Sequence, residues 1–344
     1  MEERLIHSAE GSDRSTWQKV CEESKKMWLI TLPAMLSRVA SYGVFVVTQA
    51  FIGHISSTEL AAYGLLQILG IRFVNGILIG MSSATETLCG QAFDLWPVVK
   101  LSVSSGIMLC LELWYNAVLV LLASYTNDSE VAISAFSICL NIATWEFMIC
   151  LGFLVGASVR VSNELGRGNT EAAQFSMRVN IVTAAGVGVV FWILCLAFGR
   201  DLAYVFTSDE EVIEEVSNLV VLLAFAILIN SVQPSQSGVA VGSGRQAQVA
   251  WVNIISYYVI GVPSGVLLAF VAHLGITGIW IGMMIGRATQ TIWLGFMIWR
   301  TDWDEQVERA SERLNKWLLR KPEDDPGSSA QGRLVEAGTS EEQK

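Results

Sequence analysis

The sequence predicts an all-α, polytopic membrane protein with about eight transmembrane helices. Of its 344 residues, 52% are hydrophobic and only 16% are charged, and the mean hydropathy is +0.48. Apolar runs of about 20 residues recur along the chain, and a helix of that length crosses the hydrocarbon core of a bilayer. Chain length alone would suggest two or three soluble domains, but the repeated apolar runs override that interpretation.

The apolar runs also give the order of the elements. A polar tail, residues 1–27, comes first. The eight predicted spans cover approximately residues 28–52, 60–85, 96–122, 131–158, 175–199, 212–233, 249–272 and 276–299. After residue 300 the chain is polar again. Apolar residues recur at spacings of three and four between Trp303 and Trp317, which predicts a surface helix that covers the bundle. From Pro322 onward the composition predicts disorder.

The positions of Lys and Arg predict the orientation of the spans. With a cytoplasmic N-terminus and eight spans, 18 of the 22 Lys and Arg residues fall on the cytoplasmic side, in tails, loops or the adjoining ends of spans, and only Arg200 falls on the opposite side. Cytoplasmic segments of membrane proteins carry an excess of these residues. We therefore expect both termini to be cytoplasmic.

Glu112 is the strongest chemical signal, because it lies in the middle of the predicted span 96–122. A charge at that depth is costly and usually faces a cavity or a partner. In a functional interpretation, Glu112 exchanges a proton near neutral pH, in competition with a substrate. In a structural interpretation, it stays neutral or pairs with Arg72 or Arg287 and holds helices together.

Other polar and aromatic residues within the spans are candidates for lining a substrate cavity, and packing roles remain open for them. Asn230 and Gln233 precede Pro234, which removes a backbone hydrogen bond from its helix. Besides Glu112, the predicted cavity residues are Tyr115, Asn116, Asn141, Trp145, Glu146, Asn230, Gln233 and Tyr257.

The sequence favours neither an enzyme nor a cofactor protein. The chain has three histidines and six scattered cysteines without metal-ligand spacing, so we predict no metal site and no disulfide framework. The segment Gly242–Arg245 reads GSGR, but it follows a span and lacks the GK(S/T) of a phosphate-binding loop. No nucleic-acid partner is expected.

Glycines mark two similar helix ends. Residues 79–91 (IGMSSATETLCGQ) and 155–167 (VGASVRVSNELGR) share Gly, Ser and Gly at a constant offset of 76. Such internal repeats are common in transporters. We predict that Gly152, Gly156, Gly166 and Gly168 allow close helix approach and a tight turn.

Several motifs together resemble the multidrug and toxic compound extrusion family, and its plant DETOXIFICATION branch in particular. They are ETLCGQAF (86–93), LELWY (111–115), SVRVSNELGRGN (158–169), NSVQP and SGVAVGSG within 230–244, and GVP (261–263). The resemblance implies a fold of twelve helices in two lobes of six, with a cavity between the lobes. After Phe93 this chain continues into what resembles the seventh family helix, so four helices of the first lobe are absent.

The resemblance also implies a division of the chain. Residues 1–27 would be a cytoplasmic tail and 28–93 a partial first lobe of two spans. Residues 94–300 would be a second lobe of six spans and 301–344 a second cytoplasmic tail. Glu112 matches a family position where an acid is associated with proton coupling. At Arg245 family members often have Trp instead.

The function implied by the resemblance is secondary active transport. Such a protein would exchange protons for organic cations, xenobiotics or plant phenolics such as flavonoid-like compounds, in a vacuolar or plasma membrane. The alternative is a transport-inactive short form that pairs with a full-length relative, as a homo- or hetero-oligomer. Without four helices, we expect Asn116, Asn141 and Glu146 to meet lipid unless a partner covers them.

Overall fold

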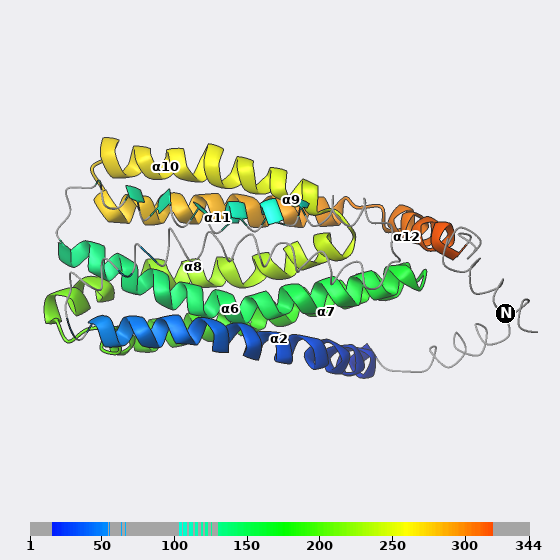
Figure 1. The fold of residues 1–344 in the computed structure, drawn as a ribbon, viewed down its shortest axis with the longest axis horizontal. Coiled ribbons are helices and arrows are strands. Elements are labelled where there is room, and N and C mark those ends of the chain that lie inside the picture. The colour runs from blue at the N-terminus through cyan, green and yellow to red at the C-terminus, as the bar shows by residue number, and fades with distance from the viewer. Residues whose placement is uncertain are drawn as a thin grey trace, which may run out of the picture.

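The computed structural model describes residues 16–53 and 130–318, together with single positions and short runs between residues 55 and 125. Every regular element among these residues is helical. Figure 1 shows long helices lying side by side along the longest axis, with α2 at one side and α10 at the other. The helices are α2 (Thr16–Gly53), α6 (Glu130–Gly166), α7 (Thr170–Ala203), α8 (Glu210–Gly242), α9 (Gln246–Asn253), η2 (Ile254–Gly261), α10 (Val262–Val266), η3 (Leu267–Val271), α11 (Gly275–Trp299) and α12 (Trp303–Leu318).

The helices confirm the predicted fold class. Among the described residues, five continuous helical segments are long and apolar enough to cross a membrane: 16–52, 134–166, 170–203, 210–242 and 246–271. The last of these segments runs from α9 through η3. Large apolar side chains such as Leu36 and Phe51 on α2 and Val182 on α7 are exposed, as expected for surfaces that face lipid. The count of eight spans remains a prediction, because 60–85 lies almost wholly, and 96–122 partly, outside the described residues.

Several helices extend beyond the predicted spans. The first span was predicted to begin at about residue 28, but α2 already begins at Thr16. The fourth was predicted to end at about residue 158, yet α6 continues to Gly166. Hydropathy marks only the part of a helix that lies in hydrocarbon, whereas polar residues continue the same backbone hydrogen bonds into the headgroup region.

A tight turn joins α6 to α7, as the glycines predict. Gly168 has a φ of +75°, a left-handed conformation that residues with a Cβ rarely adopt. Asn169 then caps α7, because its Oδ1 accepts a hydrogen bond of 3.0 Å from the backbone N–H of Ala172.

Small residues allow the central helices to approach closely. A Cβ on Gly238 or Gly242 of α8 would lie 2.2 Å from the Leu154 carbonyl oxygen and 2.5 Å from that of Ser158, respectively. These two glycines, four residues apart, face the backbone of α6. The spacing of the glycines in the SGVAVGSG motif therefore lets α8 pack closely against α6.

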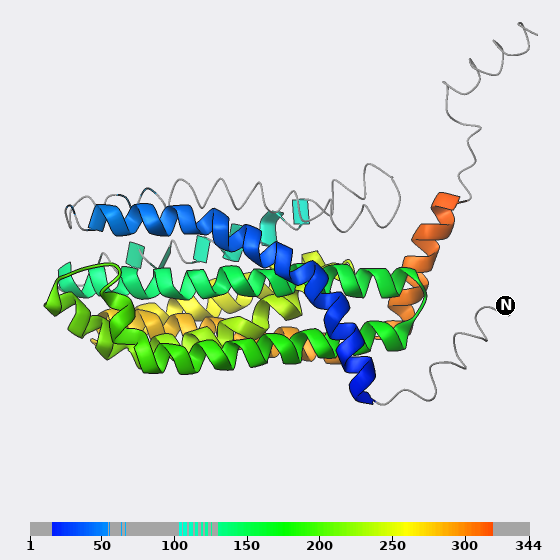
Figure 2. The same cartoon turned by 90° about the horizontal axis from the view of Figure 1, so that it is seen from below.

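The opposite side of α6 receives α2 in the same way. A Cβ on Gly152 would lie 2.2 Å from Met35 Cγ, and one on Gly156 would lie 2.1 Å from Thr31 Oγ1. The prediction that Gly152 and Gly156 permit close approach is therefore confirmed. Figure 2 shows that α2 changes direction along its length as it passes over the other helices. It contains Pro33, and a proline in a helix interior removes a backbone hydrogen bond and favours a bend.

A buried ion-pair network joins α2 to α6 near one end of the bundle. Arg160 donates from Nε to Glu23 Oε1 at 2.7 Å and from Nη2 to Glu23 Oε2 at 2.8 Å. Its Nη2 also donates to Glu164 Oε1 at 2.9 Å, and Arg167 reaches the same oxygen at 3.0 Å. Arg160, Glu23 and Glu164 thus satisfy one another away from water, whereas the Arg167 side chain is 70% exposed.

The amphipathic helix predicted over 303–317 is present as α12, Trp303–Leu318. Its apolar face contacts the ends of α6 and α7, where Trp303 and Ala310 are buried in one cluster with Val161 and Leu165. Thr170 donates a further hydrogen bond of 2.7 Å to Asp304. The helix covers this end of the bundle (Figure 1).

Candidate functional site

Glu112 lies in a buried polar cluster built by several helices. Its side chain is 4% exposed. The Tyr257 hydroxyl oxygen, from η2, lies 3.5 Å from Glu112 Oε1, and Gln233 of α8 is within hydrogen-bonding reach of the carboxyl. The predicted residues Glu112, Gln233 and Tyr257, from three separate stretches of sequence, therefore meet at one place.

The helix that carries Tyr257 has an unusual backbone. Between α9 and α10 the chain forms a π-helical stretch, η2, and a second one, η3, follows α10. A π-helical turn contains more residues than an α-helical turn, so it rotates the side chains that follow it, and such turns are frequent at functional sites. The neighbouring residue Tyr258 lies on η2 as well and donates to the Leu111 carbonyl oxygen at 2.9 Å.

Aromatic stacking fixes the position of Tyr257. Its ring is stacked on that of Tyr115, with centroids 4.4 Å apart and planes 8° from parallel. The Tyr115 hydroxyl donates to the Met283 carbonyl oxygen at 3.4 Å. Gly261 and Gly286 make room for that hydroxyl, because a Cβ on them would lie only 2.5 and 2.8 Å from the Tyr115 oxygen.

A chain of hydrogen bonds continues from Tyr257 away from Glu112. The Tyr257 hydroxyl donates to Gln290 Oε1, and Gln290 Nε2 donates to Asn253 Oδ1 at 2.6 Å. Asn253 Nδ2 then donates to the Met108 carbonyl oxygen at 3.2 Å. Since a backbone carbonyl can only accept, it fixes the orientation of the Asn253 and Gln290 amides.

A buried arginine lies on the other side of the cluster. Arg287 of α11 donates from Nη1 to Asn230 Oδ1 at 2.5 Å, and its guanidinium carbon lies 5.9 Å from the centroid of the Phe147 ring. It is within electrostatic reach of both Glu112 and Glu146. Pro234 lies inside α8, four residues after Asn230, so it cannot donate to the Asn230 backbone carbonyl.

Glu146 is a second buried carboxyl, on α6. Its Oε1 accepts a hydrogen bond of 2.8 Å from the Cys150 thiol, and its buried Oε2 has no hydrogen-bond partner among the described residues. Nearby on the same helix, Asn141 Oδ1 accepts a hydrogen bond of 3.1 Å from the Tyr42 hydroxyl of α2.

The contacts with α2 correct the expectation that Asn141 and Glu146 face lipid. Their side chains are only 6% and 4% exposed. The first described helix, α2, packs directly on α6, with Tyr42 as the polar partner of Asn141. This arrangement satisfies an amide that would otherwise face hydrocarbon.

The predicted cavity residues do not all share one environment. Tyr115, Asn141, Glu146, Asn230, Gln233 and Tyr257 are buried. Trp145 differs, because its side chain is 43% exposed and does not join the buried polar cluster. Asn116 lies outside the described residues.

The sequence analysis did not single out Gln290 and Asn253. The signal was present, since both are amides inside apolar stretches, where polar side chains are costly and usually have a function or a partner. Their spacing gave no indication that Asn253, Tyr257 and Gln290 would form one chain of hydrogen bonds.

Comparisons with known proteins identify the family. The family model MatE matches residues 33–94 and 105–267, which is more than half of the chain. The chain belongs to the MatE family. Members of this family are transporters rather than enzymes. The first matched stretch of this MatE protein ends next to the predicted junction after Phe93.

Similar curated proteins come from Arabidopsis thaliana. Protein DETOXIFICATION 24 is 36% identical over 93% of this chain and 95% of that protein, and Protein DETOXIFICATION 21 is 35% identical over 89% and 92%. Among solved structures, the crystal structure of the eukaryotic MATE transporter AtDTX14 has a TM-score of 0.76 at 21% identity. The match covers 86% of this chain and 99% of that one.

The alignment with DETOXIFICATION 24 confirms that this MatE chain is shortened. It is 477 positions long, whereas the chain has 344 residues, so at least 133 positions have no counterpart here. At about 20 residues per span plus connecting loops, these positions suffice for the four spans predicted to be missing.

Proposed function

We propose that the second lobe of this MatE transporter contains a proton-coupling site centred on Glu112. Transporters of the family move small organic cations with a proton or sodium gradient. In our proposal, Glu112 releases a proton when a cationic or phenolic substrate binds, and it takes one up when the substrate leaves. The transported compounds would be exported or stored in a vacuole.

The observation that carries this proposal is the environment of the Glu112 carboxyl. It is buried, lies in the middle of the predicted span 96–122, and is surrounded by Tyr257, Gln233 and the Arg287 guanidinium. Buried acids with polar partners at membrane depth are typical of proton relays. A second buried carboxyl, Glu146, lies within reach of the same arginine, so the charge of each can influence the other.

The Tyr257 hydroxyl links Glu112 to the chain of hydrogen bonds behind it. The Tyr257 hydroxyl has one proton, and the contact with Gln290 Oε1 uses it. The same hydroxyl lies 3.5 Å from Glu112 Oε1, to which it can donate instead. In our proposal, loss of the Glu112 proton turns the Tyr257 hydroxyl toward Glu112 and breaks its contact with Gln290.

One observation favours a second candidate function. At least 133 aligned positions of the relative are absent, and alternating access in transporters uses two repeats that move against each other. Under this alternative, the short chain does not transport by itself and instead associates with another copy or with a longer relative.

A single reconstitution experiment separates these functions. The purified chain is placed in liposomes with an imposed pH gradient, and export of a fluorescent cation is followed. A twelve-span relative is measured in parallel, in its original form and with the acid that corresponds to Glu112 changed to Gln. Proton coupling predicts that the relative transports and that its Gln variant folds but does not, because an amide cannot release a proton.

The outcomes are distinct. Retained pH-dependent transport in the Gln variant would exclude the coupling role of this position. For the short chain we expect little or no export, and a stable monomer that exports at the rate of the twelve-span relative would exclude the second candidate function.

A further inference from the structure

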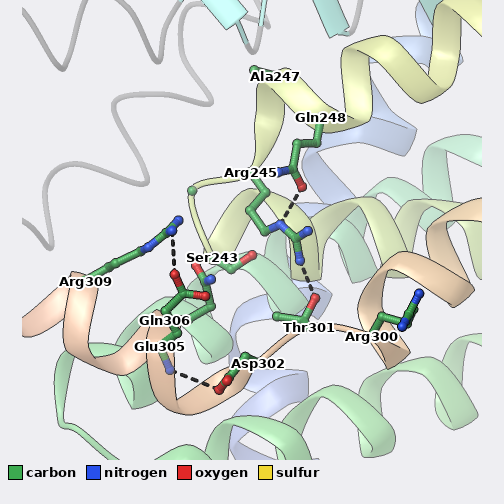
Figure 3. A pocket seen from close by; sticks show the side chains of 11 residues that line it. Ser243, Arg245, Ala247, Gln248, Arg300, Thr301, Asp302, Glu305, Gln306 and Arg309 are labelled. Carbon is green, nitrogen blue, oxygen red and sulfur yellow. Dashed lines mark hydrogen bonds and ion pairs between the residues drawn. The ribbon is translucent and has the colours of Figure 1, made fainter.

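A polar cavity of about 410 Å³ lies at the end of the bundle that carries α12, away from the Glu112 cluster. The turn between α8 and α9, the end of α11 and the first turns of α12 enclose it, as Figure 3 shows. These segments lie outside the candidate membrane spans or at their ends. The residues that line it are Ser243, Gly244, Arg245, Ala247, Gln248, Arg300, Thr301, Asp302, Glu305, Gln306 and Arg309.

The two carboxylates of this cavity already have partners. Asp302 Oδ1 accepts hydrogen bonds of 3.1 and 3.2 Å from the backbone N–H groups of Asp304 and Glu305 and so caps α12. The Glu305 carboxylate is 2.6 Å from Arg309 Nη2. Neither acid makes an ion pair with Arg245. The lining contains three arginines and two acids, so its net charge is positive.

Among the described residues, the hydrogen-bond partners of Arg245 are neutral. It donates from Nε to Gln248 Oε1 at 2.6 Å and from Nη1 to the Thr301 hydroxyl, as the dashed lines in Figure 3 mark. Burial lowers the pKa of Arg245 below its ordinary value, the positive charge of Arg309 lowers it further, and Glu305 opposes both effects. The net electrostatic environment of this guanidinium thus favours an added negative charge.

Two further groups in the cavity can donate hydrogen bonds. The Gln306 side chain is 8% exposed and has no hydrogen-bond partner among the described residues, although it lines the cavity. The first turn of α9 has no side-chain cap. Because α9 continues through η2, α10 and η3, the positive end of a long helical segment points toward this turn.

We propose that this cavity binds a phosphate-bearing anion, with Arg245 as the main ligand and Arg309 and Gln306 as additional donors. Arginine suits this role because its planar guanidinium offers several donors to phosphate oxygens at once. The site is independent of the proposed proton coupling.

The location favours the headgroup of an anionic lipid as the source of the phosphate. The cavity lies where α8 and α11 end and where the amphipathic helix α12 packs on the bundle, at the depth of lipid headgroups. With the termini on the cytoplasmic side, as predicted, this site would face the leaflet in which anionic lipids are concentrated.

Binding can be measured by native mass spectrometry on the full chain in detergent. The probes are phosphatidylinositol 4-phosphate, phosphatidylcholine and inorganic phosphate. We compare the original chain with Arg245→Gln and with Arg178→Gln, which removes the same charge from an exposed site on α7. Loss of one charge-assisted contact predicts that Arg245→Gln weakens binding of the phosphoinositide about tenfold or more, and that Arg178→Gln changes it less than about twofold.

A second variant keeps the test informative if Arg245→Gln does not fold. Gln306→Leu leaves the net charge unchanged and should weaken phosphoinositide binding several-fold. If inorganic phosphate binds tightly and this binding depends on Arg245, the anion site is supported, and its natural ligand is a soluble phosphate compound and not a lipid. Equal losses in Arg245→Gln and Arg178→Gln, or binding of phosphatidylcholine as tight as that of the phosphoinositide, would overturn the proposal.

Discussion

Arg160 and Glu23 form a two-pronged ion pair, with N–O distances of 2.7 and 2.8 Å, across 137 residues of sequence. Both side chains are buried. The pair joins α2 to α6, which the predicted division of the chain assigns to the partial first lobe and to the second lobe. If that division is right, the pair is one of the contacts that hold the two parts together.

Removal of one partner of this pair should destabilise the protein strongly. Glu23→Gln leaves the Arg160 guanidinium without its main counter-charge, and breaking a buried pair typically costs about 3–5 kcal/mol. Thermal unfolding of the purified protein in detergent measures the loss. Glu22→Gln is the matched control, because the Glu22–Lys26 pair is about half exposed and should contribute less than about 1 kcal/mol. Equal effects of the two substitutions would contradict a buried pair.

Gly238→Ala should also destabilise the protein. The new Cβ would lie 2.2 Å from the Leu154 carbonyl oxygen, so α6 and α8 would have to separate, at a cost of about 1–3 kcal/mol or more. Gly186→Ala on α7 is the control, because nothing lies within 4 Å of its Cβ and alanine is favoured over glycine in helices by up to about 1 kcal/mol. Thermal unfolding should therefore show opposite signs for the two changes.

Gln290→Met tests the chain of hydrogen bonds behind Glu112. The substitution leaves the buried Tyr257 hydroxyl and the Asn253 amide without the group that joins them, so we expect a loss of about 1–3 kcal/mol in stability. Thr289→Val, next to it on an exposed face of α11, should be nearly neutral in the same unfolding experiment. A neutral result for Gln290→Met would mean that the two groups find other partners.

The predicted orientation can be tested with tags at both termini. In sealed vesicles of known sidedness, protease should reach both tags from the cytoplasmic side, because Lys and Arg are concentrated in the segments predicted to lie there. Tags on opposite faces would contradict an even number of spans.

The sequence alone determined the class of the protein. Apolar runs longer than 20 residues predict membrane-spanning helices. In the bilayer core no water is present, so each backbone N–H and C=O group must form its hydrogen bond within the helix. The motifs around Glu112, Gly156 and Gly238 also sufficed to identify the family. The spacing of the glycines predicted close helix contacts, since only small residues permit them.

The tertiary structure decided which residues meet. Tyr42 covers Asn141, Glu23 binds Arg160, and Gln290 joins Tyr257 to Asn253, and no local pattern predicts these pairs. Hydropathy is a property of short windows, whereas these contacts depend on the rotation and bending of whole helices. The π-helical stretch η2 illustrates this dependence, because it changes the direction of Tyr257 without any change in composition.

The same reason explains the corrected predictions. From sequence, the loss of four helices was expected to leave Asn141 and Glu146 facing lipid unless a partner covered them, but both are buried, and α2 packs against α6 beside Asn141. Trp145, predicted as a cavity residue, is 43% exposed. Sequence determined that these polar and aromatic side chains lie within apolar helices. Only packing decided which of them are covered, because burial is set by the neighbouring helix and not by the residue itself.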